Sequence, residues 1–199
     1  MKKDNNLFID LDVKDNFLFP NFLDKEYFLV MEYAEGGTLH NYLEENFSSL
    51  NWQDKYRIAL QLSNAIECLH EKGIVHNDLS SNNILVQQDS IKLADFGLSK
   101  RIKVTNQISL DTIPYSDPEG FNIKNANSLE GKYQVEKYKL NEKSDVYSVG
   151  VLLWELSSGK KPFSDRKYNL PLAMEIIQGL RESKIEGTPE EYSNLYAGK

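Results

Sequence analysis

VHNDLSSNNILV at residues 75–86 and IKLADFGL at residues 91–98 are the stretches of this sequence that decide its fold. Each holds a short apolar run, Asn83 to Val86 in the first and Ile91 to Ala94 in the second, with a polar turn between them. Two short apolar runs around a polar turn are typical of a β-hairpin. The sequence therefore predicts a small hairpin here.

Three side chains with oxygen atoms that could bind a metal ion flank this hairpin. Asp78 lies in the loop before the first strand, Asn83 opens that strand, and Asp95 follows the second strand. A hairpin brings these strand ends together, so two carboxylates and a carboxamide are expected to converge. Hard oxygen ligands of this kind suit Mg²⁺, which takes one or two carboxylates plus substrate phosphates. Any one of these aspartates alone could equally belong to a solvated loop.

The residues before the hairpin are predicted to be mainly helical. Thr38 can cap a short helix through Leu43, and Asn51 can cap a longer one that Gly73 ends. In the longer helix, apolar residues recur at intervals of three or four, which is typical of an amphipathic helix. These residues are Trp52, Tyr56, Ala59, Leu62, Ile66 and Leu69.

A second long helix is predicted after the hairpin. Ser144 and Asp145 open it, the run Val146 to Leu156 is apolar nearly all round, and Gly159 closes it. A helix that is apolar all round belongs in the middle of a fold. Pro171 is well placed for the first turn of a further helix over 170–180.

The remaining segments give weaker signals. The run Glu26 to Tyr33 is apolar and aromatic, which predicts a buried strand. Residues 7–13 alternate at period two and suggest another strand, whereas Asp15 to Pro20 is predicted to be a loop. Residues 99–143 are polar and without a period, so we expect an irregular segment.

Composition and charge limit the classes of protein to which this sequence can belong. The 199 residues are 40% apolar, enough for one domain with a real core, and the net charge of −7 disfavours nucleic-acid binding. The single cysteine, Cys68, excludes an internal disulfide and a Cys-based zinc site, and is expected to be a small buried hydrophobe. The longest apolar run, 149–154, is too short to span a bilayer, and the acidic start does not fit a secretory signal. We therefore expect a soluble, cytoplasmic protein.

The motif His76-x-Asp78-Leu79-x-x-x-Asn83, followed by Asp95-Phe96-Gly97, resembles the catalytic loop and metal-binding triplet of eukaryotic protein kinases. Three further motifs resemble this family and occur in its order. The first, Val30-Met31-Glu32-Tyr33-Ala34 before Gly36-Gly37, is similar to the hinge between the kinase lobes. The second, Asp117-Pro118-Glu119, is similar to the end of the activation segment. The third, the stretch Ser144 to Gly150, is similar to the start of the central helix.

The resemblance covers residues 26 to about 180 and implies an α+β, protein-kinase-like fold. It implies that residues 1–31 are a remnant of the N-terminal lobe, that 32–37 form the hinge, and that 38–199 form a C-terminal lobe that is incomplete at its end. The fold would consist mainly of the helical C-terminal lobe.

The resemblance also assigns roles to individual residues. Asp78 would accept the proton of the substrate hydroxyl, and Asn83 and Asp95 would hold the Mg²⁺ ions that bridge the ATP phosphates. His76 would pack against Phe96 rather than act in catalysis. Asp145 would brace the backbone near His76 without touching the substrate.

For ATP, the resemblance implies a second set of contacts. Main-chain groups of Glu32 and Ala34 would bond the adenine edge, Met31 would be the gate to the pocket and Leu85 its floor. Met31 and Leu85 could equally be plain core residues. ATP, Mg²⁺ and a protein substrate are therefore the expected ligands and partner, with no nucleic acid and no membrane span.

Several features depart from the family pattern. No glycine precedes Gly36, and none of the lysines before Glu26 lies in a Val-Ala-x-Lys context, so the phosphate clamp is missing from this sequence. The family's arginine partner for Glu119 is missing as well. Asn77 replaces the arginine that commonly grips a phosphate on the activation segment, so phosphorylation of Ser99, Thr105, Ser109 or Ser116 would lack the usual charge-assisted pair.

The acceptor residue is predicted from two positions. Thr112, three residues before Tyr115, matches the Ser/Thr kinase pattern, whereas Ser80 matches neither the Ser/Thr nor the tyrosine class. The function expected is transfer of the ATP γ-phosphoryl group to a Ser/Thr hydroxyl of a protein, with tyrosine second. The alternative is a catalytically impaired fragment or pseudokinase that acts as an interaction module. Because the phosphate clamp is missing, the chain alone is expected to bind Mg-ATP weakly, to phosphorylate generic substrates barely above background and to self-associate.

Overall fold

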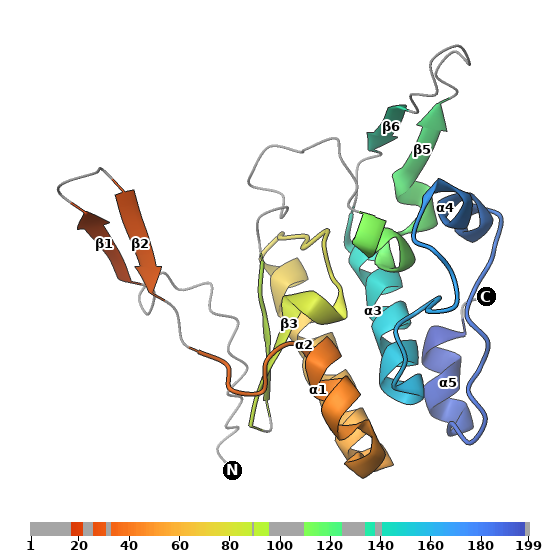
Figure 1. Cartoon of the computed structure of the whole chain (residues 1–199), viewed down its shortest axis with the longest axis horizontal. Coiled ribbons are helices and arrows are strands. Elements are labelled where there is room, and N and C mark those ends of the chain that lie inside the picture. Colours follow the sequence, from red (N-terminus) through yellow and green to blue (C-terminus); the bar gives the residue numbers. More distant parts are fainter. Residues whose placement is uncertain are drawn as a thin grey trace.

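The computed structural model describes residues 17–21, 26–30, 33–88, 90–95, 110–124, 134–137 and 141–197 (Figure 1). In 17–21, 26–30, 122–124 and 134–137 it describes the backbone alone. The described part is mixed, with α-helices and three two-stranded antiparallel sheets, which agrees with the α+β class that the sequence predicts.

Both predicted N-terminal helices are present. Helix α1 (Leu39–Asn46) starts after Thr38, whose Oγ1 accepts a hydrogen bond from Asn41 N at 3.2 Å. It continues three residues beyond the predicted end at Leu43. Helix α2 (Trp52–Glu71) begins with a capping box, in which Asn51 and Asp54 bond each other's main-chain N–H. Of the residues predicted to form its apolar face, Ala59, Leu62, Ile66 and Leu69 are buried and Trp52 is partly buried, whereas Tyr56 is exposed.

The predicted hairpin is confirmed. Strands β3 (Ile84–Gln87) and β4 (Ser90–Leu93) pair antiparallel, with Ile84 opposite Leu93 and Val86 opposite Ile91. These four side chains are buried. The hairpin is therefore anchored in the core by one face and holds the loops at its ends in place.

A second hairpin shows one prediction to be wrong. Strand β1 (Phe17–Asn21) pairs antiparallel with β2 (Glu26–Val30), so 17–20 is strand where a loop was expected. Pro20 is compatible with this strand, because in a two-stranded sheet a proline can lie in a strand whose outer edge is unpaired. The predicted strand over 7–13 lies outside the described residues, and β2 covers only the first five residues of the predicted strand.

The segment expected to be irregular also contains structure. It has short 3₁₀ helices at Leu110–Tyr115 and Pro118–Gly120, and strands β5 (Phe121–Lys124) and β6 (Gln134–Lys137) that pair antiparallel. Elements of three to six residues are too short to show a period, which is why the pattern did not reveal them.

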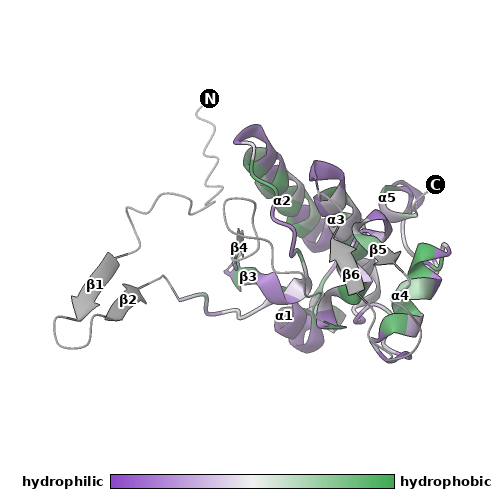
Figure 2. Ribbon diagram, turned by 90° about the horizontal axis from the view of Figure 1, so that it is seen from above, coloured by the Kyte–Doolittle hydropathy of each residue, from purple (hydrophilic) through white to green (hydrophobic). Residues whose placement is uncertain are grey.

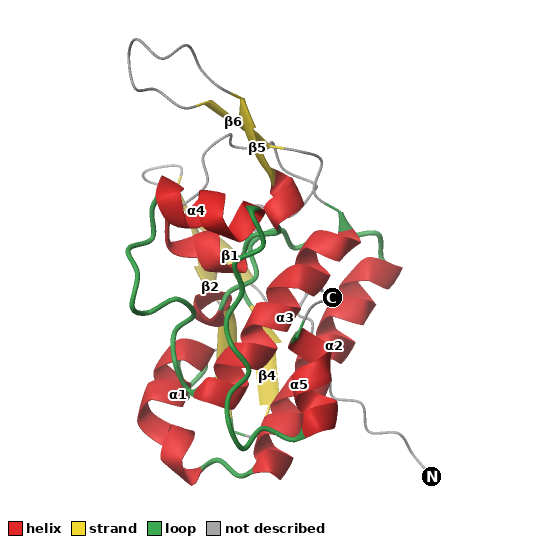
Figure 3. Cartoon of the chain, turned by 90° about the vertical axis from the view of Figure 1, so that its right-hand side faces the viewer, coloured by secondary structure: helices red, strands yellow, loops and turns green. Residues whose placement is uncertain are grey.

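The apolar helix lies at the centre of the helical layer. Helix α3 (Glu142–Ser158) begins four residues before the expected start at Val146, because Asn141 is its cap, in a reciprocal box with Ser144. It ends at Gly159 with φ +64°, as predicted. Figure 3 shows α3 beside α2 and α5, and both pairs are in contact.

Two short helices complete the described part. Helix α4 (Leu170–Ile177) is capped by Asn169 and carries Pro171 in its first turn, but ends three residues earlier than expected. Helix α5 (Glu190–Tyr196) was not predicted. It is held by Tyr192, which is fully buried and donates a hydrogen bond to Leu153 O at 3.2 Å.

The main core lies between α1, α2, the β3–β4 hairpin, α3 and α5, and a smaller core lies around α4. In Figure 2, α4 is coloured as mostly apolar, whereas α2 carries both apolar and polar residues along its length. Cys68 is only half-buried, so it is less enclosed than expected. Among the described residues, no helix is both long and apolar enough to cross a membrane.

Candidate active site

The side chain of Asp145, near the start of α3, fixes the main chain of the loop between α2 and β3 by hydrogen bonds. This fully buried carboxylate accepts hydrogen bonds from His76 N and Asn77 N, each at 2.9 Å, and lies 2.9 Å from His70 Nε2. The bracing role predicted for Asp145 is therefore confirmed. Asn77 has φ +66°, a conformation that asparagine tolerates better than most side chains.

His76 is a fixed, neutral part of this support. It is fully buried, and its Nε2 lies 3.1 Å from Ala94 O at the end of β4. Burial lowers the pKa of His76, although the carboxylates of Asp145, Asp78 and Asp95 act in the opposite direction. Because a carbonyl only accepts, the neutral imidazole carries its proton on Nε2. Phe96, its expected packing partner, lies outside the described residues.

Asp78 and Asn83 are joined directly. Asn83 Nδ2 donates to the main-chain oxygen of Asp78 at 2.7 Å and to its Oδ2 at 3.1 Å. Ala94 N donates to Asn83 O at 2.9 Å, which ties the end of β4 to the same point. Asp95 follows immediately and is exposed, with φ +59°. The structure thus brings the three predicted side chains to one end of the hairpin.

The donor set at this end fits a hard divalent cation. Because Asn83 Nδ2 is used by Asp78, its Oδ1 is the atom that remains for a ligand, and the structure gives this oxygen no hydrogen bond among the described residues. Asp95 adds an exposed carboxylate. No group of three or more His, Cys, Asp or Glu side chains gathers within the described ranges, so substrate oxygens would have to complete the coordination of Mg²⁺.

The predicted hinge is pinned to the edge of β3. Gly36 N donates to Val86 O at 3.0 Å, and Val86 N donates to Gly37 O at 2.8 Å. A Cβ on Gly36 would lie 2.6 Å from Val86 O, so this approach requires glycine. Ala34 is buried just before it, and Leu85 is partly buried on β3. Met31 and Glu32 lie outside the described residues.

Sequence reasoning missed a buried polar network beside the loop that leads into β3. Glu155 is 1% exposed, and its Oε2 accepts a 2.7 Å hydrogen bond from the hydroxyl of Tyr115. That hydroxyl also lies 3.1 Å from Ser81 Oγ, and Ser148 Oγ donates to Tyr115 O at 2.7 Å. Burial and the charge of Glu155 raise the pKa of Tyr115 far above its ordinary value. A lone acid inside the apolar helix was the available signal, because a buried carboxylate needs a partner.

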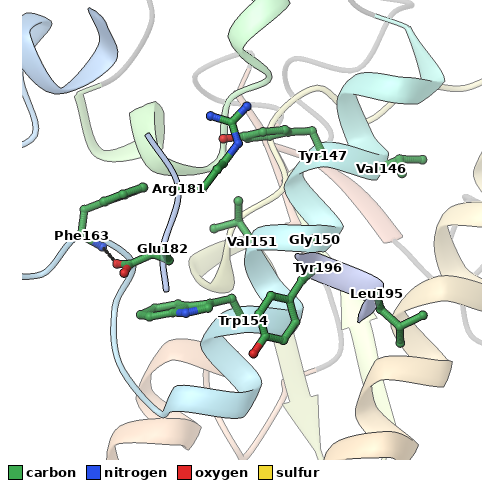
Figure 4. A pocket seen from close by; sticks show the side chains of 10 residues that line it. All are labelled: Val146, Tyr147, Gly150, Val151, Trp154, Phe163, Arg181, Glu182, Leu195 and Tyr196. Atoms are coloured by element: carbon green, nitrogen blue, oxygen red, sulfur yellow. Dashed lines mark hydrogen bonds between the residues drawn. The ribbon is translucent and has the colours of Figure 1, made fainter. Parts of the chain in front are cut away.

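A cavity of about 290 Å³ lies elsewhere, between α3, α5 and the chain near Arg181 (Figure 4). The guanidinium of Arg181 lies 5.3 Å from the ring centre of Tyr147, and Phe163 N donates to Glu182 Oε1 at 2.5 Å. None of the predicted site residues lines this cavity. The candidate site is therefore the end of the hairpin.

Comparison with known proteins agrees with this geometry. Residues 18–197 match the family model described as protein tyrosine and serine/threonine kinase. The chain is 39% identical over 172 residues to the leaf rust 10 disease-resistance locus receptor-like protein kinase-like 1.4 of Arabidopsis thaliana, covering 81% of this chain and 24% of that protein.

Two other relatives come from different kinds of protein. The probable serine/threonine-protein kinase roco5 of Dictyostelium discoideum is 34% identical over 81% of this chain and 6% of its own length. A probable L-type lectin-domain containing receptor kinase of Arabidopsis thaliana is 37% identical over 69% of this chain and 21% of its own. The chain spans about a quarter or less of these relatives. It belongs to the protein tyrosine and serine/threonine kinase family.

Proposed function

We propose that this chain forms the catalytic part of an ATP-dependent protein kinase that phosphorylates a Ser/Thr hydroxyl, and less readily Tyr, of a protein substrate. The observation that carries the proposal is the hydrogen-bonded pair of Asp78 and Asn83. Ala94, the residue before Asp95, is joined to this pair because its N–H donates to Asn83 O. The arrangement supports the proposal, because a carboxylate that could accept a proton then lies at the same end of the hairpin as oxygens that could bind a cation.

Asp78 is the proton acceptor for the attacking hydroxyl. The hydrogen bond from Asn83 Nδ2 to Oδ2 fixes the orientation of its carboxylate. Such positioned proton transfer contributes about 10²–10⁴-fold to rate. Asn83 and Asp95 hold the cation, and Mg²⁺ supplies charge neutralisation at the phosphates when it is bound.

The nucleotide base lies against the hinge. Main-chain groups of Glu32 and Ala34 bond the adenine edge, Met31 gates the pocket and Leu85 forms its floor. The support for this part is the pair of main-chain hydrogen bonds that join Gly36 and Gly37 to Val86, because they hold the residues after Ala34 against β3. Residues 32–37 are then the hinge, and 38–199 are the C-terminal lobe.

The class of acceptor rests on Thr112 and on the names of relatives. Ser116 Oγ donates to Thr112 O at 2.8 Å, which holds Thr112 in the 3₁₀ helix that ends at Tyr115. Roco5 is named a probable serine/threonine-protein kinase. We place the domain in the cytoplasm, where ATP is available.

The test is transfer of labelled γ-phosphate to a generic protein substrate. Asp78→Asn should lower turnover by about 10²-fold or more and leave ATP affinity nearly unchanged, whereas Asp95→Asn should abolish the Mg²⁺-dependent reaction. Asp165→Asn, at an exposed position, is the matched control. Equal loss of nucleotide binding in both site variants contradicts the division of roles, and wild-type protein that binds Mg-ATP without transfer favours a pseudokinase.

A further inference from the structure

A buried hydrogen-bond network joins the loop of Asp78 to α3. Ser81 Oγ lies 3.1 Å from the hydroxyl of Tyr115, and that hydroxyl donates to Glu155 Oε2 at 2.7 Å. All three side chains are buried, and Ser81 and Glu155 are each 1% exposed. We call these residues the Ser81–Tyr115–Glu155 network. The network ends, at Ser81, between the two site residues Asp78 and Asn83.

The directions of the two hydrogen bonds follow from the donors that are available. Burial and the charge of Glu155 raise the pKa of Tyr115, so its hydroxyl keeps its single proton. Glu155 Oε2 takes this proton in its hydrogen bond, because a carboxylate only accepts. Ser81 Oγ is therefore the donor to the hydroxyl oxygen of Tyr115. Removal of the Ser81 hydroxyl takes away one directed hydrogen bond from the middle of the loop.

The residue Ser81 belongs to the same short turn as Asn83. Residues Ser81–Asn83 form a 3₁₀ helix, and Asn83 N donates to Ser80 O at 3.0 Å. Asn83 Nδ2 in turn donates to the main-chain oxygen and to Oδ2 of Asp78. The position of Ser81 therefore sets the position of Asn83, and Asn83 orients the carboxylate of Asp78.

The other end of the network is fixed in the core. Glu155 lies on α3, and Ser148 Oγ, on the same helix, donates to Tyr115 O at 2.7 Å. Tyr115 is the last residue of the 3₁₀ helix Leu110–Tyr115 and packs into the main core. Because α3 holds Tyr115 at two points, a shift of Tyr115 breaks a buried hydrogen bond. Tyr115 is thus a rigid anchor for Ser81.

We propose that Ser81 is a positioning residue for phosphoryl transfer, whose hydroxyl, through Tyr115 and Glu155, sets the place of Asp78 and Asn83 relative to α3. The inference rests on the proposed kinase function and adds to it a residue to which that function gives no role. Phosphoryl transfer depends almost entirely on positioning and electrostatic stabilisation, so a small displacement of Asp78 lowers its rate.

The first test is the rate at which the 199-residue chain transfers labelled γ-phosphate to a generic protein substrate. Ser81→Ala should lower kcat about two- to tenfold, as expected for one lost neutral hydrogen bond, and should change KM for Mg-ATP less than about twofold. Ser157→Ala is the matched control, because Ser157 is another buried serine, on α3, whose Oγ donates to Trp154 O at 2.8 Å. This control should leave kcat within about twofold of the wild-type value.

A double variant separates an effect through Tyr115 from a local effect at Ser81. Tyr115→Phe removes the hydroxyl and keeps the ring, and should lower kcat at least as much as Ser81→Ala. In the Tyr115→Phe background the Ser81 hydroxyl has lost its acceptor, so Ser81→Ala should lower kcat no further. Reductions in kcat that multiply in the double variant overturn the proposal.

Hydrogen exchange of the main-chain N–H of Asn83 tests the same inference without catalysis. Ser81→Ala and Tyr115→Phe should each speed this exchange about two- to tenfold, because the turn opens more readily, whereas Ser157→Ala should not. Exchange that is unchanged in both site variants, or equally faster in Ser157→Ala, overturns the role of Ser81. Wild-type protein that transfers no phosphate contradicts the kinase function instead, and the exchange rates then decide whether Ser81 positions the loop.

Discussion

Replacing Asp145 with alanine should destabilise the protein more than any other single change near the site. The carboxylate is fully buried and accepts two main-chain N–H groups, from His76 and Asn77, at 2.9 Å each. It also lies 2.9 Å from His70 Nε2. Alanine removes the acceptor of both main-chain N–H groups.

The size of the effect follows from the number of bonds. Hydrogen bonds to a charged group contribute about 1.5–3 kcal/mol each, so the two main-chain bonds together give about 3–6 kcal/mol. Since a typical domain has about 5–15 kcal/mol of unfolding free energy, Asp145→Ala should remove a large part of it. Asp145→Asn keeps one acceptor oxygen and should cost about half as much.

Urea unfolding followed by circular dichroism measures this difference. The control is Asp165→Ala, because Asp165 is an exposed aspartate, and it should change the unfolding free energy by about 0.5 kcal/mol or less. A loss below about 1 kcal/mol for Asp145→Ala, or an equal loss in both alanine variants, would refute the argument that Asp145 holds the loop.

Three further outcomes are expected. Because Asn77 cannot pair with a phosphate on the activation segment as arginine would, phosphatase treatment of an active sample should change turnover less than tenfold, or about 1.4 kcal/mol. A larger drop means that another cation binds that phosphate. Gly36→Ala should lower the unfolding free energy by about 1–3 kcal/mol, since its Cβ would meet a β3 carbonyl oxygen at 2.6 Å. A Cβ on Gly150 would meet no atom within 4 Å outside its own helix backbone and chain neighbours, so Gly150→Ala should raise the unfolding free energy by about 0.5–1 kcal/mol; equal effects in calorimetry exclude this reasoning. Burial lowers the pKa of His76 from 6.5, so its contribution to the unfolding free energy is complete above pH 6.5 and is lost as pH falls through the lowered pKa. The urea midpoint should therefore fall on acidification in the His40→Gln variant, which removes the opposite contribution of His40. A midpoint that does not change with pH argues against this reasoning.

Local patterns predicted the parts of the fold that local chemistry determines. Thr38 and Asn51 cap their helices, and the β3–β4 hairpin forms where two apolar runs flank a polar turn. These features depend on residues within a few positions of one another. The end of α3 at Gly159 belongs to the same group, since a left-handed residue closes the helix.

Other features depend on contacts between distant residues. Tyr115 and Glu155 are 40 positions apart, so their hydrogen bond has no sequence period. Helix α5 is short and is stabilised by Tyr192 against α3, which a seven-residue pattern does not show. The early start of α3 depends on the cap at Asn141, which lies outside the apolar run.

At the candidate site, the motif predicted which residues meet, and the geometry supplied how they are joined. Asp78, Asn83 and Asp95 were named from their spacing, and the structure gathers them at one end of the hairpin. The orientation of the Asn83 amide, which leaves Oδ1 for a ligand, depends on side-chain rotamers that no sequence pattern encodes.

The most direct test of the account is the Mg²⁺ dependence of ATP binding, measured as the shift in melting temperature. Wild-type protein should be stabilised by ATP only when Mg²⁺ is present, because Asn83 and Asp95 would bind the nucleotide phosphates through the cation. Asp95→Asn should lose this shift, and Asp165→Asn should keep it. A shift that is the same without Mg²⁺, or that Asp95→Asn retains in full, would contradict the assignment of this end of the hairpin as the nucleotide and metal site.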